Sequence, residues 1–240
     1  MSNITNSISL TPVIPYLSNE NFSCKMIDEN DLKSWDKAKP SVFIISLNVQ
    51  GLLAKREKLN LFISSISNKY RLPDIICVQE TWLNRDSEPF CLSNYHPLIH
   101  SHRSNAKGGG VGFFVHENIS YDINYDLSLF VDRIYESIAI NIHIDNKRYS
   151  LVNLYRPPTT PELTDTQSFD IFLSNLNKVI DKCPHNSYFF MDSNVNLLHK
   201  NLLADKFIDL WSMYGFSNSI TTKTRVTLNS NSLIFRFCDI

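Results

Sequence analysis

Three short apolar segments of this chain each lead directly into carboxamide or carboxylate side chains. They are 42–48, which ends in Asn48; 74–80, which ends in Gln79 and Glu80; and 187–191, which is followed by Asp192, Ser193 and Asn194. Short β-rich apolar runs bounded by polar residues are typical of buried strands. Polar groups at the ends of buried strands can converge at one edge of a sheet, where a rigid scaffold supports a site. This pattern constrains the chain to a layered fold with one polar edge.

The rest of the chain predicts helices and further strands. Helical spacing of apolar residues predicts helices over 55–70 and about 202–214, and Thr164 with Gln167 fits a capping box that opens a helix ending near Ile180. Glycines 108–112 predict a turn that leads into a strand. Segments 137–144 and 149–155 predict a hairpin joined at Asp145-Asn146. This mixture predicts an α/β domain in which sheet packs on sheet and helices lie outside.

Composition limits the classes of protein to which the chain can belong. Its 240 residues carry 23 Lys and Arg against 24 Asp and Glu, a net charge of −1, which excludes polybasic-tail binding. No apolar run approaches the ~18 residues of a membrane helix, and no signal peptide is evident. Five cysteines without a C-x-x-C pair indicate reduced thiols. We therefore expect an intracellular protein, nuclear or cytoplasmic, that is not secreted and is not bound to a membrane.

Two regions are predicted from these features. Residues 1–40, rich in Ser, Asn and Thr with three prolines, predict a flexible leader or linker, and residues 41–240 predict the domain.

The oxygen-rich strand ends indicate a metal site. Carboxylate and carboxamide oxygens suit Mg²⁺, which is usually held by one or two carboxylates together with phosphate oxygens and water. The carboxylates of Glu80 and Asp192 are sufficient to hold one Mg²⁺ if the fold brings them together. Tyr155 and Arg156 end another strand, where a phenol and a guanidinium can contact a phosphate. The alternatives stay open: each polar residue simply caps a strand end or starts a turn, and Arg156 is simply exposed.

Weaker signals point elsewhere. His96, His100 and His102 match no common zinc spacing. Arg103 and Lys107 form a modest basic loop that could touch phosphates, and Trp82 is expected to pack in the core rather than to act as a base-stacking platform.

An ordered set of motifs carries a family resemblance. It comprises S-L-N-V-Q-G (46–51), I-C-V-Q-E-T-W-L (76–83), K-G-G-G-V-G-F-F-V (107–115), L-V-N-L-Y-R-P-P (151–158), F-M-D-S-N-V-N (190–196) and T-R-V-T (224–227). Over about 42–235 the chain resembles the endonuclease/exonuclease/phosphatase family. Within it, the motifs are most similar to the endonuclease domain of non-LTR (LINE-type) retrotransposons, which is similar to apurinic/apyrimidinic endonucleases.

The resemblance implies a four-layer α/β sandwich, two packed mixed sheets flanked by helices, and a Mg²⁺-dependent phosphodiesterase that nicks DNA, with Mn²⁺ as the alternative ion. It implies that Glu80 and Asn48 lie at the metal, that Asp192 orients the attacking water, and that DNA phosphates are held by a wider set of residues. That set is Asn48, Tyr155 and Asn194, with Thr224 and Arg225 from a loop similar to the family's. Arg156 is added to it for the chemistry of its guanidinium. Met191 replaces the family's Gly before the Asp. We expect a monomer.

The resemblance weakens near the C-terminus. Phe235 stands where the family has an Asp, and no Ser-Asp-His follows. We therefore expect a domain that is incomplete after about 234 and lacks closing strands, and we consider Asp239 only as a disfavoured substitute ligand. Two further hypotheses remain: a catalytically inactive, truncated remnant that at most binds nucleic acid or protein, and a hydrolase of small or lipid phosphoesters. A reverse transcriptase would belong to the parent element, not to this chain.

Overall fold

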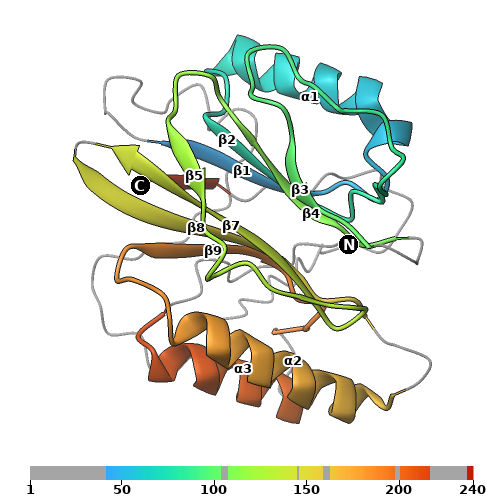
Figure 1. Cartoon of the computed structure of the whole chain (residues 1–240), viewed down its shortest axis with the longest axis vertical. Helices are drawn as coiled ribbons and strands as arrows, with labels where there is room; N and C mark the ends of the chain where they lie inside the picture. Colours follow the sequence, from blue (N-terminus) through green and yellow to red (C-terminus); the bar gives the residue numbers. More distant parts are fainter. Residues whose placement is uncertain are drawn as a thin grey trace, which may run out of the picture.

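Four layers build the molecule. The computed structural model describes residues 42–103, 108–144, 146–158, 163–197, 201–216 and 237–239. Figure 1 shows helix α1 (Arg56–Lys69) on one sheet, a second sheet against the first, and helices α2 (Asp165–Ile180) and α3 (Leu202–Met213) on the outer face of the second sheet. The predicted α/β sandwich of two packed mixed sheets is confirmed.

The first sheet has the strand order β10-β1-β2-β4-β3. Its strands are β1 (Phe43–Asn48), β2 (Ile75–Gln79), β3 (Ile99–Ser101), β4 (Val111–Val115) and β10 (Phe237–Asp239). β1 and β2 are parallel, with Asn48 opposite Gln79, so both strands end at the same edge. The short helix η2 (Leu53–Lys55) leads from β1 into α1.

The second sheet has the order β5-β7-β8-β9, and β6 also pairs with β7. Its strands are β5 (Tyr121–Ile123), β6 (Phe130–Val131), β7 (Tyr135–Ile144), β8 (Lys147–Tyr155) and β9 (Ser187–Asp192). β7 and β8 form the predicted hairpin. β8 and β9 are parallel, with Tyr155 opposite Asp192, so they also end at a common edge.

Strand periodicity sorts the side chains between the layers. In β1, Phe43, Ile45 and Leu47 belong to a core beneath α1, whereas Ile44 faces the second sheet. In β7, Ile138, Ile140 and Ile142 fill the layer between the sheets. A third core joins the opposite face of the second sheet to α2 and α3. Successive strand residues point to opposite faces, which explains how alternating sequence positions supply three separate cores.

The capping box of α2 is present as predicted. Thr164 Oγ1 accepts from the Gln167 backbone N–H at 3.3 Å, and the Thr164 backbone N–H donates to Gln167 Oε1 at 3.2 Å. These bonds satisfy N-terminal groups that a helix cannot pair internally.

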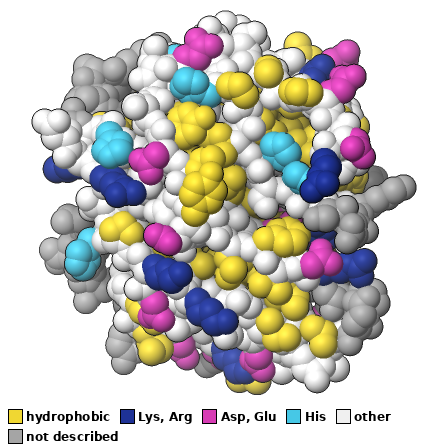
Figure 2. All heavy atoms as spheres, viewed as in Figure 1, with side chains coloured by type: hydrophobic (Ala, Val, Ile, Leu, Met, Phe, Trp, Pro, Cys, Tyr) yellow, Lys and Arg dark blue, Asp and Glu magenta, His cyan; other side chains and the backbone are white. Residues whose placement is uncertain are grey.

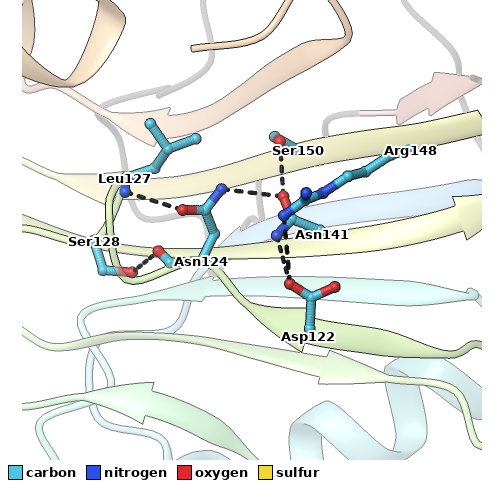
Figure 3. Close-up of polar contacts among 7 residues, drawn as sticks. All are labelled: Asp122, Asn124, Leu127, Ser128, Asn141, Arg148 and Ser150. Carbon is cyan, nitrogen blue, oxygen red and sulfur yellow. Dashed lines mark hydrogen bonds and ion pairs between the residues drawn. The ribbon is translucent and has the colours of Figure 1, made fainter. Parts of the chain in front are cut away.

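A polar cluster at the β5–β7–β8 strands is shown in Figure 3. Buried Asn141 donates from Nδ2 to Asp122 Oδ2 at 2.6 Å, and its Oδ1 accepts from Ser150 at 2.8 Å and from Asn124 at 3.1 Å. This network satisfies a buried amide inside an apolar sheet, so its role is to fix strand pairing.

Several sequence-based expectations fall outside the described residues. These are the leader over 1–40, the Thr224-Arg225 pair and the chain around Phe235. The incompleteness of the domain after about 234 stays a prediction, although β10 occupies the outer edge of β1. Within the described ranges, no helix has the length and apolarity needed to cross a bilayer.

Candidate active site

The Asn48 side chain joins the carboxylates of Glu80 and Asp192. Its Nδ2 donates to Glu80 Oε1 at 2.6 Å and to Asp192 Oδ2 at 2.5 Å. Glu80 is 32 positions from Asn48 and Asp192 is 144 positions away. The structure therefore brings together the three strand ends that the sequence singled out.

Strand register explains this convergence. Asn48 lies an even number of residues after Ile44, so its side chain shares the face of β1 that looks toward the second sheet. Asp192 lies two residues after Phe190, which also packs between the sheets. The parallel pairs β1–β2 and β8–β9 end at the same side, so the polar residues at their ends meet across the sandwich.

Backbone strain is concentrated around these strand ends. Glu80 has φ +54° and Asn194 has φ +49°, in the left-handed region that residues other than glycine seldom adopt. Gln50 and Trp82, in the same loops, have φ values of +44° and +55°. Such conformations persist where the surroundings enforce them and cluster at functional sites.

The Tyr155 side chain lies in the field of both carboxylates. It is buried, and burial raises the pKa of its hydroxyl strongly, with further increases from the negative charges of Glu80 and Asp192. Tyr155 therefore stays protonated at neutral pH and can donate a hydrogen bond at the site.

Asn194 and Arg156 are positioned by the turn after β9. The Asn194 backbone N–H donates to Asp192 Oδ1 at 3.3 Å, and its Nδ2 donates to the Arg156 carbonyl at 2.7 Å. Arg156 is buried, and its guanidinium lies 5.0 Å from the Phe169 ring centroid and 5.7 Å from that of Phe172. These contacts stabilise α2 against the sheet and lend no support to the predicted phosphate contact of Arg156.

A buried ion pair that the sequence did not reveal lies beside Tyr155. Arg103 Nε donates to Glu136 Oε1 at 2.6 Å, and the Gly110 backbone N–H donates to Glu136 Oε2 at 2.6 Å. Glu136 is the cross-strand partner of Tyr155. Burial raises the pKa of Glu136, while Gly110 and Arg103 oppose that rise. The sequence placed Arg103 in a basic loop that could touch phosphates; its guanidinium is buried against this carboxylate.

The glycine turn is shaped to admit this ion pair. Gly109 has φ +65°, and a Cβ there would lie 2.5 Å from Arg103 Nε and 2.6 Å from Glu136 Oε1. The predicted glycine turn is confirmed, and its function is close approach of backbone to a buried charge pair.

A second buried network ties the two sheets together behind the site. Gln79 Nε2 donates to Asn153 Oδ1 at 2.6 Å and to Ser46 Oγ at 2.9 Å. Asn153 Nδ2 donates to the carbonyls of Gly112 at 2.8 Å and Val78 at 3.0 Å. Since Gln79 precedes Glu80 and Asn153 lies two residues before Tyr155, the network fixes one site-bearing strand against another.

The donor set fits a hard divalent cation. It consists of oxygen ligands from two carboxylates and one carboxamide, and Asn48 Oδ1 is buried without a hydrogen-bond partner among the described residues. Such an orphaned acceptor is costly unless a donor or cation satisfies it. No group of three or more His, Cys, Asp and Glu side chains able to hold a metal occurs in the described ranges. The protein would therefore supply only a few of the ligands of a bound ion. Magnesium commonly completes its shell with water and phosphate.

Asp239 does not belong to this site. β10 runs antiparallel to β1 and pairs Asp239 with Phe43, at the end of β1 opposite Asn48. Five residues of extended strand separate Phe43 from Asn48, about 17 Å.

Comparison with known proteins agrees with this architecture. The sequence profile of the Endonuclease/Exonuclease/phosphatase family matches residues 45–189, more than half of the chain. No curated protein sequence matches the chain. Among solved structures, the endonuclease domain of TRAS1, a telomere-specific non-LTR retrotransposon, is 15% identical with a TM-score of 0.55, over 82% of each chain.

Two further solved structures are similar. TDP2 of D. rerio, complexed with a single-strand DNA product, is 14% identical with a TM-score of 0.50, over 83% of each chain. An AP endonuclease from Archaeoglobus fulgidus is 20% identical with a TM-score of 0.46, over 64% of this chain and 58% of that one. At these identities the likeness to the TRAS1 domain and to D. rerio TDP2 shows the shared fold alone. Together with the profile match, the fold identifies this chain as a member of the endonuclease/exonuclease/phosphatase family.

Proposed function

We propose that this chain is a Mg²⁺-dependent phosphodiesterase that nicks DNA, of the kind found in non-LTR retroelements. The observation that carries the proposal is the Asn48 amide, which donates to Glu80 and Asp192 at once and so joins the polar ends of both sheets. Family membership supports phosphoester hydrolysis, and the TRAS1 likeness motivates the retroelement assignment.

Glu80 and Asn48 are the residues that would hold the cation, through a carboxylate oxygen and Oδ1 respectively. When bound, Mg²⁺ neutralises charge on a phosphate and on the group that leaves it. Mn²⁺, which also prefers oxygen ligands, is the alternative ion.

The remaining side chains act on water and phosphate. The Asp192 carboxylate accepts a hydrogen bond from a water and orients it for in-line attack. Tyr155, kept protonated by its raised pKa, donates to a phosphate oxygen. An amide NH₂ carries two hydrogens, so Asn194 can donate to the phosphate while it keeps its bond to the Arg156 carbonyl.

DNA is the substrate class that we propose, on the basis of the retroelement and TDP2 likenesses. Electrostatic attraction is expected to be local. The net charge is −1, and Figure 2 shows Lys and Arg interspersed with Asp and Glu over the visible face. Recognition would therefore depend on contacts near the scissile phosphate, with a shallow dependence of affinity on salt.

Nicking of supercoiled plasmid in Mg²⁺ tests the proposal. We expect wild type to convert supercoiled to open-circular DNA. Glu80→Gln and Asp192→Asn should each lower the rate at least ~100-fold, because the first removes the charge that would hold the cation and the second removes the charge that orients the water. Glu88→Gln, at an exposed position of the loop after β2, is the matched control and should nick as wild type does. Equal rates for wild type and Glu80→Gln would refute the proposal.

A binding-only domain is the second candidate. It is favoured because, among the described residues, no group of three or more His, Cys, Asp and Glu side chains could hold a metal ion. A positioned general base typically contributes ~10²–10⁴-fold in rate, so a protein without one would nick slowly. Binding without nicking would support this candidate, and faster cleavage of bis(p-nitrophenyl) phosphate than of DNA would support a small-phosphoester hydrolase.

A further inference from the structure

Trp82 lies two residues beyond Glu80, and its side chain is 51% exposed. The expected core packing of Trp82 is wrong. Tryptophan is on average a highly buried residue, so an indole held half in solvent beside the candidate site calls for an explanation.

The Trp82 ring is held in a fixed position against the backbone of Gly51 and Gly108. Its backbone has φ +55°, and its N–H donates to the Gly109 carbonyl at 2.9 Å. A Cβ at Gly51 would lie 2.9 Å from Trp82 Cε3, and one at Gly108 would lie 3.9 Å from Nε1. The ring therefore packs directly against glycine backbone. An indole held in this way loses little conformational freedom when a ligand stacks on its open surface.

The loop backbone that holds the Trp82 ring also positions Glu80. The Gly51 N–H donates to the Glu80 carbonyl at 2.8 Å, and the Thr81 N–H donates to the Gly110 carbonyl at 3.2 Å. Gly110 in turn donates to Glu136. The loop that carries the indole is thus fixed relative to the carboxylate cluster.

We propose that Trp82 is a specificity-determining residue that stacks on an unpaired base next to the bound phosphate. This inference rests on the proposed function for the position of that phosphate. Two residues span at most ~7 Å, and nucleotides rise ~3.4 Å along a strand, so a base within about two nucleotides of the phosphate is in reach. Every base has an aromatic face on which an indole can stack. In a fully paired duplex these faces are covered by neighbouring base pairs. The chain should therefore prefer DNA with an unpaired base beside the cleavage position.

Fluorescence anisotropy with labelled oligonucleotides tests the inference. The probes are a fully paired duplex and the same duplex with one unpaired base, with Ca²⁺ in place of Mg²⁺ so that binding is read without cleavage. Trp82→Ala should weaken binding to the unpaired-base duplex about 5- to 150-fold and leave the paired duplex unchanged. Trp82→Phe should keep most of the preference because it keeps an aromatic face.

Two controls separate stacking from folding. Trp82→Leu keeps an apolar side chain at this position, so it should retain the wild-type melting temperature and lose the preference for the unpaired-base duplex. Tyr125→Ala removes an aromatic side chain that is 78% exposed between β5 and β6 and should bind both probes as wild type does. Equal affinities of wild type and Trp82→Leu for the unpaired-base duplex would overturn the inference, as would an equal loss on both duplexes.

The nicking assay distinguishes failure of this inference from failure of the proposed function. A wild type that nicks plasmid but shows no preference for an unpaired base refutes the role of Trp82 alone. A wild type that shows a Trp82-dependent preference but does not nick refutes the proposed hydrolysis and supports the stacking of Trp82 on an unpaired base.

Discussion

Replacing Asn153 by Leu tests the network that joins the two sheets. Asn153 is fully buried and makes three side-chain hydrogen bonds, to Gln79 Nε2 at 2.6 Å and to the carbonyls of Gly112 and Val78 at 2.8 and 3.0 Å. Leu has a similar size and cannot form any of them. The substitution therefore removes the hydrogen bonds while it keeps most of the packing.

The expected loss in the free energy of unfolding follows from these bonds. Gln79 Nε2 keeps its bond to Ser46 but loses one partner inside the core, which costs about 1–3 kcal/mol, and each lost carbonyl bond costs about 1 kcal/mol. Added apolar burial offsets about 1 kcal/mol. The net destabilisation is about 2–4 kcal/mol, which corresponds to a fall in Tm of about 5–15 °C for a domain of this size.

Urea unfolding followed by circular dichroism measures this change. Asn175→Ala is the control. Asn175 donates to the carbonyl of Ile171 and accepts a long bond of 3.5 Å from Lys178 Nζ, both within its own helix, so its loss should cost no more than about 1 kcal/mol. The reasoning is refuted if Asn153→Leu unfolds at the wild-type urea concentration with an unchanged m-value. Nicking should also slow in Asn153→Leu below its melting temperature, because Glu80 and Tyr155 flank the network.

Three more perturbations follow from the structure. Gly109→Ala should destabilise the fold by about 3 kcal/mol or more, since φ is +65° and the new Cβ would lie 2.5 Å from Arg103 Nε. Gly215→Ala, with φ +74° and no described atom within 4 Å, should cost only about 1 kcal/mol, so equal melting temperatures of the two variants would contradict this reasoning. Thr164→Ala should cost about 1 kcal/mol in urea unfolding through loss of the capping box, and an unchanged midpoint would argue against it. The pKa of Tyr155 is raised in the folded state, so its contribution to the free energy of unfolding is full below the unfolded pKa of about 10 and is lost as the pH rises above that value. Tyr155→Phe should therefore flatten the decline in unfolding free energy above about pH 10, and an unaltered slope would count against this assignment.

The principal strands and helices could be predicted because their patterns are long enough to show a period. The β7–β8 hairpin and the α2 capping box lie where alternation and local chemistry indicated. β3, β5, β6 and β10 were not predicted, since segments of two or three residues carry no periodicity and depend on pairing with distant strands.

The three polar strand ends that meet at the site were identified because each interrupts an apolar run. Core packing was expected of Trp82 from its residue type, but its side chain is 51% exposed, in a loop where its backbone has φ +55°. The Arg103–Glu136 pair was missed because its partners are 33 residues apart. A signal was present, since a carboxylate within the apolar strand 135–144 needs a buried partner.

Titration of Mn²⁺ into the full chain by isothermal calorimetry tests most directly whether Asn48 and Glu80 hold a cation. The account predicts one binding event in wild type that is weakened at least ~10-fold in Glu80→Gln, because that variant lacks the carboxylate that would hold the ion, and is unchanged in Glu88→Gln. Equal Mn²⁺ affinity in wild type and Glu80→Gln, with both proteins folded, would contradict it.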